Sequence, residues 1–191
     1  MEILAVFKKQ RFVVQNEVFT YRIVTESGAL MSNLSEIELK SEYLPAFIAS
    51  TEAVFRAMLG WQLSVETTCK GKEFRPGHDV TGIIGFAGGL KGTIVVSIDK
   101  EVAFAAADIF IGQRPTTING DVLDLVGELA NMIGGGAKER FAFPDIVLGL
   151  PTTVSGKDYK ISFNPGIEVE TVQFLCPFGS LTIQIAIQRP V

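Results

Sequence analysis

The sequence has 191 residues, a length that fits one domain with or without a short appendage. It is 47% hydrophobic and 20% charged, so it carries the apolar side chains of a sizeable core, which excludes a disordered protein. The net charge is −4 and no basic stripe is visible, so nucleic acid is not an expected partner.

No run of about 18 apolar residues is present, so no membrane span is expected. The first residues, MEILAVFKKQRFVV, lack the basic-then-apolar order of a secretory signal. We therefore expect a cytoplasmic protein.

The cysteines and the histidine give no signal for a metal or a nucleophile. Cys69 and Cys176 have no CxxC spacing and no histidine neighbours, and we expect both to be free core thiols of a cytosolic protein. His78, the single histidine, lies in the turn-like stretch RPGHD, which predicts a loop residue. One histidine argues against a His-based metal site and against a Ser-His-Asp triad. No metal ligand set is expected on this chain.

The first 40 residues are predicted to be an N-terminal appendage to a domain that covers residues 41–191. Two β-rich runs, Arg11–Val14 and Val18–Val24, flank Asn16 and predict a hairpin or an added pair of edge strands. Met31 offers an alternative start of the chain.

The first half of the main domain reads as a helix, three strands and a second helix. Pro45 suits the first turn of the first helix, and Gly60 suits its end. Asp99 is expected to cap the second helix, which Gly112 ends. The predicted elements are a helix over Leu44–Trp61, strands over Leu63–Thr68, Val80–Ala87 and Thr93–Ile98, and a helix over residues 100–112.

A long helix and four strand candidates make up the second half, which begins near residue 115. Turns with the sequences SG, NPG and PFG separate the strands, and the last strand alternates apolar and polar side chains. Two similar α-β-β-β halves of this kind predict an α+β fold, in which an antiparallel sheet has helices packed on one side. The strand candidates are Ile146–Pro151, Ser155–Phe163, Ile167–Cys176 and Ser180–Gln188.

The long helix, Asp121–Phe141, has two faces of different chemistry. At about 100° per residue its apolar side chains fall on one broad side, and its polar ones fall on the other within an arc of roughly 80°. Asn119 is a suitable N-cap. A run of three glycines, 134–136, predicts a bend, an end or the close approach of another backbone. The polar residues are Asp121, Asp124, Glu128 and Asn131.

Two interpretations of this polar side are open, a solvated face and a functional one. A single Glu-x-x-Asn pair on a helix more often belongs to a solvated face. Asparagine has a poor helix propensity, however, and the glycines lower the stability of the helix further. Both features therefore indicate a role beyond solubility.

The run GELANMIGGGAK resembles the signature of the CheC, CheX and FliY family of chemotaxis phosphatases. The motif of that family is a helical E-x-x-N, matched by Glu128 and Asn131, usually within D-x-x-x-E-x-x-N, which Asp124 fits. The opening helix, LPAFIASTEAVFRAMLG, is also similar, so the resemblance covers about residues 44–188. Gly136 is a departure, because relatives often have Asn in a G-N-A-K run, and we interpret that position as structural.

Only one motif is present in this chain. In the first helix the corresponding residues are Glu52, Ala53, Val54 and Phe55, so that a phenylalanine replaces the asparagine. This is similar to the CheX-like arrangement, whose members are dimers. The resemblance therefore implies a homodimer with one site in each chain.

The resemblance implies a phosphatase that dephosphorylates the aspartyl-phosphate of a CheY-like response regulator. Glu128 and Asn131 would be the catalytic residues: Asn131 would orient the attacking water, and Glu128 would pair with a lysine of the regulator. Asp121, Asp124 and Gly135 would lie at the partner interface. The regulator would supply Mg²⁺, so no cofactor is expected on this chain.

Two other classes of function stay open. The first is a non-catalytic CheC-like binding or scaffold module in chemotaxis or flagellar-switch signalling, against which the presence of both Glu128 and Asn131 argues. The second is a metal- or nucleotide-dependent enzyme. The chain has no G-x-x-x-x-G-K-[ST] loop, and IGFAGGLKG reads as a hairpin turn rather than a phosphate-binding loop.

Overall fold

The computed structural model describes the backbone of residues 12–14, 17–19, 33–70, 78–141, 145–156, 159, 161–163, 167 and 169–188, and side chains from residue 43 onward. None of the described helices is both long and apolar enough to cross a membrane. In chain order the elements are β1 (Phe12–Val14), β2 (Glu17–Phe19), α2 (Asn33–Leu59), β3 (Ser64–Lys70), β4 (Val80–Ala87), β5 (Lys91–Ile98), α3 (Lys100–Ile111), α4 (Gly120–Lys138), β6 (Val147–Leu148), β7 (Thr152–Ser155), β8 (Val169–Cys176) and β9 (Gly179–Gln188).

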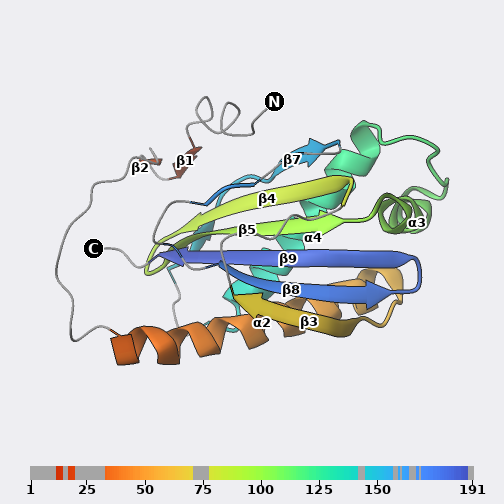
Figure 1. Cartoon of the computed structure of the whole chain (residues 1–191). Helices are drawn as coiled ribbons and strands as arrows, with labels where there is room; N and C mark the ends of the chain where they lie inside the picture. Colours follow the sequence, from red (N-terminus) through yellow and green to blue (C-terminus); the bar gives the residue numbers. More distant parts are fainter. Residues whose placement is uncertain are drawn as a thin grey trace.

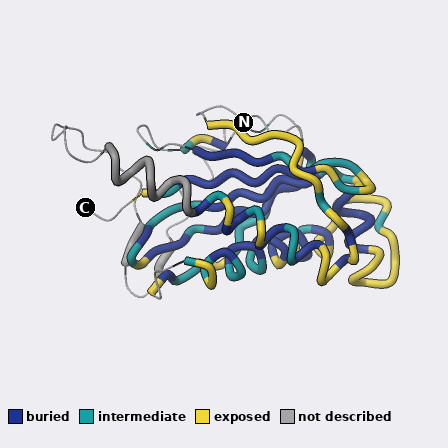
Figure 2. The backbone as a smooth tube through the Cα atoms, turned by 90° about the horizontal axis from the view of Figure 1, so that it is seen from below, coloured by how far each residue is buried: buried dark blue, intermediate teal, exposed yellow. Residues whose placement is uncertain are grey.

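One antiparallel sheet organises the molecule. Its strands follow the order β3-β8-β9-β5-β4-β6, and β7 also pairs with β4. α2 and α4 lie on one face of this sheet, and α3 stands at one end of the strands (Figure 1). Buried residues concentrate on the strands and on the helix sides turned toward them (Figure 2). The predicted α+β fold, with helices on one side of an antiparallel sheet, is confirmed.

The main core lies between the sheet and the helices. Alternate residues of β5 and β9, such as Ile94 and Ile183, enter it together with the apolar side of α4. At Gly82 of β4, α4 approaches the sheet through its backbone. A Cβ on this glycine would lie 2.9 Å from both Ala130 Cβ and the Val126 carbonyl oxygen, so a larger residue would push the helix away.

Several predicted elements of the first half are confirmed, including the β4–β5 hairpin and α3. Asp99 precedes α3, and Gly112 ends it in the left-handed conformation, with φ 74°. The Asp99 side chain does not cap the helix, however. The amide of Lys100 donates instead to Asp79 Oδ2 at 3.2 Å, so a residue beside β4 caps α3.

α2 is longer than the predicted helix over Leu44–Trp61, because it begins at Asn33, and Pro45 lies inside it. A proline in a helix interior removes one backbone hydrogen bond and disfavours the helical conformation of the residue before it. Two features offset this cost. The preceding residues are rich in strong helix formers, and Tyr43 is buried against Phe141 with ring centroids 5.0 Å apart.

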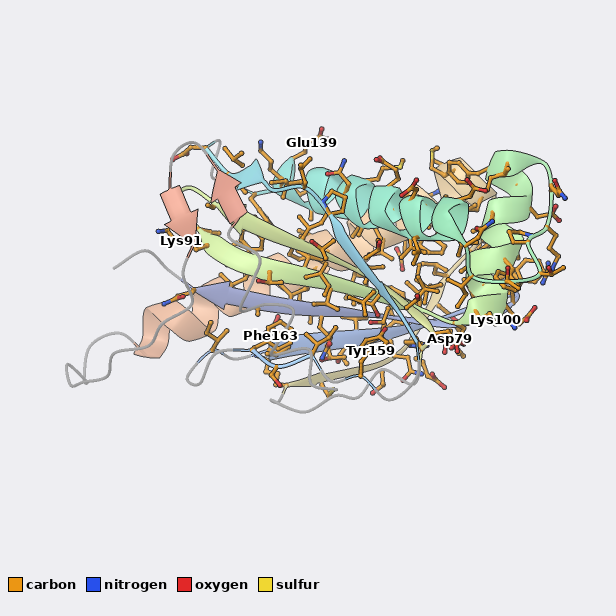
Figure 3. The ribbon with its side chains drawn as sticks, turned by 90° about the horizontal axis from the view of Figure 1, so that it is seen from above. Asp79, Lys91, Lys100, Glu139, Tyr159 and Phe163 are labelled. Atoms are coloured by element: carbon orange, nitrogen blue, oxygen red, sulfur yellow. The ribbon has the colours of Figure 1, made fainter. Side chains whose placement is uncertain are left out.

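The predicted strand over Ser155–Phe163 is wrong. β7 ends at Ser155, and neither Tyr159 nor residues 161–163 belong to a strand. These residues lie on the sheet face opposite α4, where Ile161 packs against Ile83 and Val95. Figure 3 shows Tyr159 and Phe163 on one side of the sheet and Glu139, at the end of α4, on the other. The β-like pattern thus came from packing onto a sheet face.

The other strands of the second half are present with different bounds. β6 is only two residues long, within the strand predicted over Ile146–Pro151, and β7 follows it. β8 begins at Val169, and β9 covers the last predicted strand. Leu181, Ile183 and Ile185 of β9 enter the core as the alternation predicted.

Near the N-terminus, β1 and β2 pair with each other in an antiparallel register. β2 overlaps the predicted strand over Val18–Val24 at its first two residues, and residues 20–24 lie outside the described part of the chain. α2 runs continuously through the boundary predicted between residues 40 and 41. The division into an appendage and a phosphatase domain stays a prediction.

Candidate functional site on helix α4

α4 is positioned by its N-cap and by its apolar side. Asn119 Oδ1 accepts a hydrogen bond from the amide of Val122 at 3.1 Å, which confirms the predicted cap. Asp121 adds a negative charge in the first turn, where it favours the positive end of the helix dipole. The apolar side packs on β4, β5, β7 and α2, so the orientation of the opposite side is fixed.

The five residues predicted for the site lie in one row along that opposite side, which we call the α4 stripe (Asp121, Asp124, Glu128, Asn131 and Gly135). Successive members are three or four residues apart, the spacing that keeps side chains on one helix face. Asp121, Asp124 and Glu128 are exposed, and Asn131 and Gly135 are half-buried. At 1.5 Å per residue the stripe is about 21 Å long.

Glu128 and Asn131 form the chemical centre of the stripe. They are one turn apart, so their Cβ atoms are neighbours at roughly 5–6 Å. The carboxylate is an acceptor of hydrogen bonds, and the carboxamide both donates and accepts. With Glu128 exposed and Asn131 half-buried beside it, the pair can bind a cation and a water molecule at the same time.

The three glycines at 134–136 do not end α4, and they differ in what surrounds them. The helix continues past them to Lys138. A Cβ on Gly136 would lie 2.5 Å from Ser50 Oγ of α2, and one on Gly134 would lie 3.1 Å from Ile94 Cδ1. A Cβ on Gly135 would meet nothing within 4 Å. The predicted close approach of another backbone is therefore wrong for Gly134 and Gly136, because their near neighbours are side chains, and packing gives no reason for Gly135.

Two other segments border the stripe. On one side, Ser50 of α2 donates a buried hydrogen bond to the Ile133 carbonyl at 2.7 Å, which ties α2 to the helix near Asn131. On the other side, the loop between β6 and β7 packs on Gly127. A Cβ there would lie 3.5 Å from Pro151 and 3.3 Å from Thr153 Cγ2.

The first helix offers no second site of this kind. Phe55 stands where the motif would need asparagine, and its side chain is fully buried in the core. Glu52, three residues earlier, is half-buried. The aromatic side chain serves the packing of α2.

His78 is part of a buried network that local sequence reasoning missed. Its Nδ1 lies 2.6 Å from Asp99 Oδ1, and its Nε2 lies 2.8 Å from Thr182 Oγ1. Asp99 Oδ2 also accepts from the amide and the hydroxyl of Ser180, at 2.7 and 2.9 Å. The partners of His78 are 21 and 104 residues away in the chain, so no local pattern reveals them.

The residue types of this network are those of a catalytic Asp-His-Thr relay, but its position in the fold indicates a structural hydrogen-bond network. Thr182 is fully buried, so no substrate can reach its hydroxyl. Burial acts to raise the pKa of Asp99, but the hydrogen bonds from His78 and Ser180 outweigh it, and the pKa is lowered. The network joins the start of β4, the start of α3 and the β8–β9 turn.

Among the described residues, no cluster of three or more His, Cys, Asp or Glu side chains is arranged to hold a metal ion. Cys69 and Cys176 are both free. Cys69 is exposed on the edge strand β3, which corrects the expectation of a core thiol, and Cys176 is half-buried.

Comparisons with known proteins point to one family. A family model described as Chemotaxis phosphatase CheX matches residues 80–175, which include α4. The CheY-P phosphatase CheX of Thermotoga maritima is 27% identical over 119 residues, covering 61% of this chain and 77% of that protein.

Solved structures agree with this match. Chemotaxis protein CheX from Vibrio vulnificus is 29% identical with a TM-score of 0.71, covering 77% of this chain and 99% of that chain. A CheX of Borrelia burgdorferi, solved in a complex with CheY, BeF₃ and Mg²⁺, has a TM-score of 0.61 at 24% identity, covering 77% of this chain and 98% of that chain. At 24% identity, the similarity to the Borrelia burgdorferi protein shows a shared fold only.

Proposed function

This chain belongs to the CheX family of chemotaxis phosphatases, and from that premise we propose that it hydrolyses the aspartyl-phosphate of a CheY-like response regulator. The observation that carries the proposal is the pair Glu128 and Asn131, one turn apart on the open side of α4. The named activity of the Thermotoga maritima relative, a CheY-P phosphatase, agrees with it.

Asn131 orients the attacking water in the proposed reaction. The water oxygen attacks phosphorus, and the bond from phosphorus to the aspartyl oxygen breaks, which releases the aspartate carboxylate and inorganic phosphate. An acyl phosphate is already reactive, so the enzyme mainly has to hold a water in line with that bond. A neutral carboxamide can do this without the repulsion that a carboxylate would meet from the phosphoryl oxygens.

Glu128 fixes the regulator in register. Its carboxylate is exposed beside Asn131, so it can form a charge-assisted hydrogen bond with a cationic side chain at the regulator's active site. In the family resemblance that side chain is a lysine. Asp121, Asp124 and Gly135 extend the same surface toward both ends of the helix, and they contact the partner in this proposal.

Mg²⁺ belongs to the regulator in this scheme. It would neutralise charge on the phosphoryl group, and the residues of the α4 stripe would need no metal of their own. Mg²⁺ is also present in the complex of the Borrelia burgdorferi CheX with CheY. We place the protein in the cytoplasm, where such regulators act.

The protein is also proposed to be a homodimer that pairs through β3. This strand lies at one edge of the sheet and bonds only to β8 among the described strands. All seven of its residues are exposed. An open edge of this length presents unpaired backbone groups that a second copy can satisfy.

The test is the loss of acid-labile phosphate from a phosphorylated CheY-like regulator, with and without this protein. We expect the wild type to accelerate the loss and Asn131→Ala to reduce kcat by 10²-fold or more, with binding of the regulator nearly unchanged. Glu128→Ala should weaken binding as well as the rate. Near-normal turnover by Asn131→Ala would rule out the mechanism, and binding without turnover by the wild type would favour the scaffold function.

A further inference from the structure

Leu150, in the loop between β6 and β7, is exposed to an unusual degree. Its side chain is 82% exposed, whereas the other exposed large hydrophobic residues of the described chain are at most 50% exposed. An isolated apolar residue on a surface needs no explanation. Leu150 does need an explanation, because its loop is held in place near a candidate site while its side chain stays in solvent.

The backbone around Leu150 is held on both sides. The amide of Gly149 donates to the Gly85 carbonyl of β4 at 2.8 Å. Thr152, two residues later, pairs with Ile83 in the sheet. The leucine is therefore presented on a fixed loop, which reduces the conformational entropy lost when a partner covers it.

The same loop is seated against α4 next to the site. Pro151 packs on Gly127, where a Cβ would lie 3.5 Å from the proline ring. Gly127 directly precedes Glu128 and lies one turn before Asn131. A Cβ on Gly127 would also lie 3.3 Å from Thr153 Cγ2, which is a tight contact, so β7 and the residue that follows Leu150 lie against the helix segment just before Glu128.

We propose that Leu150 is a specificity-determining contact, which inserts into an apolar depression of the regulator beside its phosphorylated aspartate. The inference rests on the proposed function, because the regulator is the occupant that covers the adjoining stripe. Continuity with the stripe favours this occupant over a second copy of the chain, whose proposed interface is β3 at the opposite edge of the sheet. Leu150 contributes binding and takes no part in the chemistry.

The experiment compares wild type, Leu150→Ser and Leu150→Met in two assays. One assay measures kcat and KM for hydrolysis of a phosphorylated CheY-like regulator, and the other measures Kd for the same regulator activated with BeF₃⁻. Leu175→Ser, which removes an exposed leucine from the sheet face opposite α4, is the matched control. Light scattering and melting temperature are recorded for every variant.

Leu150→Ser should raise both KM and Kd by about tenfold or more, with kcat little changed, and Leu150→Met should restore most of the affinity. Leu175→Ser should leave KM and Kd unchanged. Equal KM and Kd in wild type and Leu150→Ser would overturn the inference while the phosphatase function stands. A wild type that binds without hydrolysis, with binding lost in Leu150→Ser, would overturn the function alone. Loss of dimer in Leu150→Ser at unchanged KM would assign the leucine to a second copy.

Discussion

The glycines of α4 meet different neighbours, and the differences separate packing from function. Gly127 makes room for the β6–β7 loop, and Gly136 makes room for Ser50 of α2. Gly135 faces open space on the α4 stripe. A glycine that no neighbour requires, in a helix that it weakens, is best explained by the close approach of a partner from outside.

Alanine substitutions at the two last glycines should therefore have opposite effects. Gly135→Ala should raise the free energy of unfolding by up to about 1 kcal/mol through helix propensity, and should lower the affinity for the regulator. Gly136→Ala should lower the free energy of unfolding by about 1–3 kcal/mol, because its methyl group would meet Ser50 Oγ at 2.5 Å. Chemical denaturation and turnover measure the two effects. A destabilised Gly135→Ala protein would show that its position is structural.

At the scale of the element, the stripe joins three exposed carboxylates on one helix, Asp121, Asp124 and Glu128. A row of negative charge speeds the approach of a partner that carries positive charge around its active site. The stripe thus combines a long-range electrostatic attraction with the short-range chemistry of Asn131.

Charge reversal should weaken association and change its salt dependence. Asp124→Lys is expected to lower the association rate several-fold at low ionic strength, with little change in melting temperature, because the residue is exposed. Asp121→Lys should also lose about 0.3–1 kcal/mol of helix stability, since it places a cation at the positive end of the dipole. Asp145→Lys makes the same change of charge off the stripe. If Asp124→Lys and Asp145→Lys lowered the association rate equally, the effect would come from the net charge of the protein and not from the α4 stripe.

The hydrogen-bond network around Asp99 predicts that the stability of the protein depends on pH. Its pKa is lowered in the folded protein, so the unfolded state binds the proton more readily, and stability falls as pH drops through the folded pKa. The contribution is fully present above the unfolded value near 3.8. Asp99→Asn should therefore destabilise the protein at pH 7 by about 1 kcal/mol, below the usual range for a hydrogen-bonded charge, because the carboxylate side chain is 34% exposed and partly screened by solvent.

The difference between wild type and Asp99→Asn should shrink as the pH falls below about 4. Urea denaturation at several pH values measures it. Because Asn keeps the size of the side chain, a packing effect alone would give a difference that does not vary with pH, and such a constant difference would contradict the assignment.

At the scale of the whole molecule, the proposed regulator-binding surface and the proposed dimer interface lie at different edges of the sheet. α4 and the β6–β7 loop lie toward the β4 edge, whereas β3 forms the other edge. A dimer that pairs through β3 would therefore leave both α4 stripes free. Each chain could then bind one regulator.

Lysines on β3 should produce a monomer that keeps its fold. Val65→Lys combined with Thr67→Lys places charge on an exposed edge strand, which disfavours edge-to-edge pairing. Light scattering should report half the mass of the wild type, and turnover for each chain should persist. An unchanged mass would place the interface elsewhere or show that the wild type is a monomer.

The sequence alone predicted the architecture through the order of its elements, and helical periodicity placed the candidate residues on one helix face. The roles given to these residues came from the family resemblance. Helical spacing located α4, and Asn119 located its start. The same spacing placed Asp121, Asp124, Glu128, Asn131 and Gly135 on one face. These features depend on the spacing of residues within one helix of the chain, so no knowledge of the fold was needed.

Only the tertiary structure decided what depends on residues far apart in the chain. It buried His78 between Asp99 and Thr182, and it held the helix intact through Pro45. It also laid residues 159–163 onto the sheet instead of into it. Leu150 belongs to the same class, because its place beside the stripe depends on the contact between Pro151 and Gly127. Burial and hydrogen bonding between residues far apart in the chain outweigh local propensity. Such contacts cannot be predicted from a local sequence pattern.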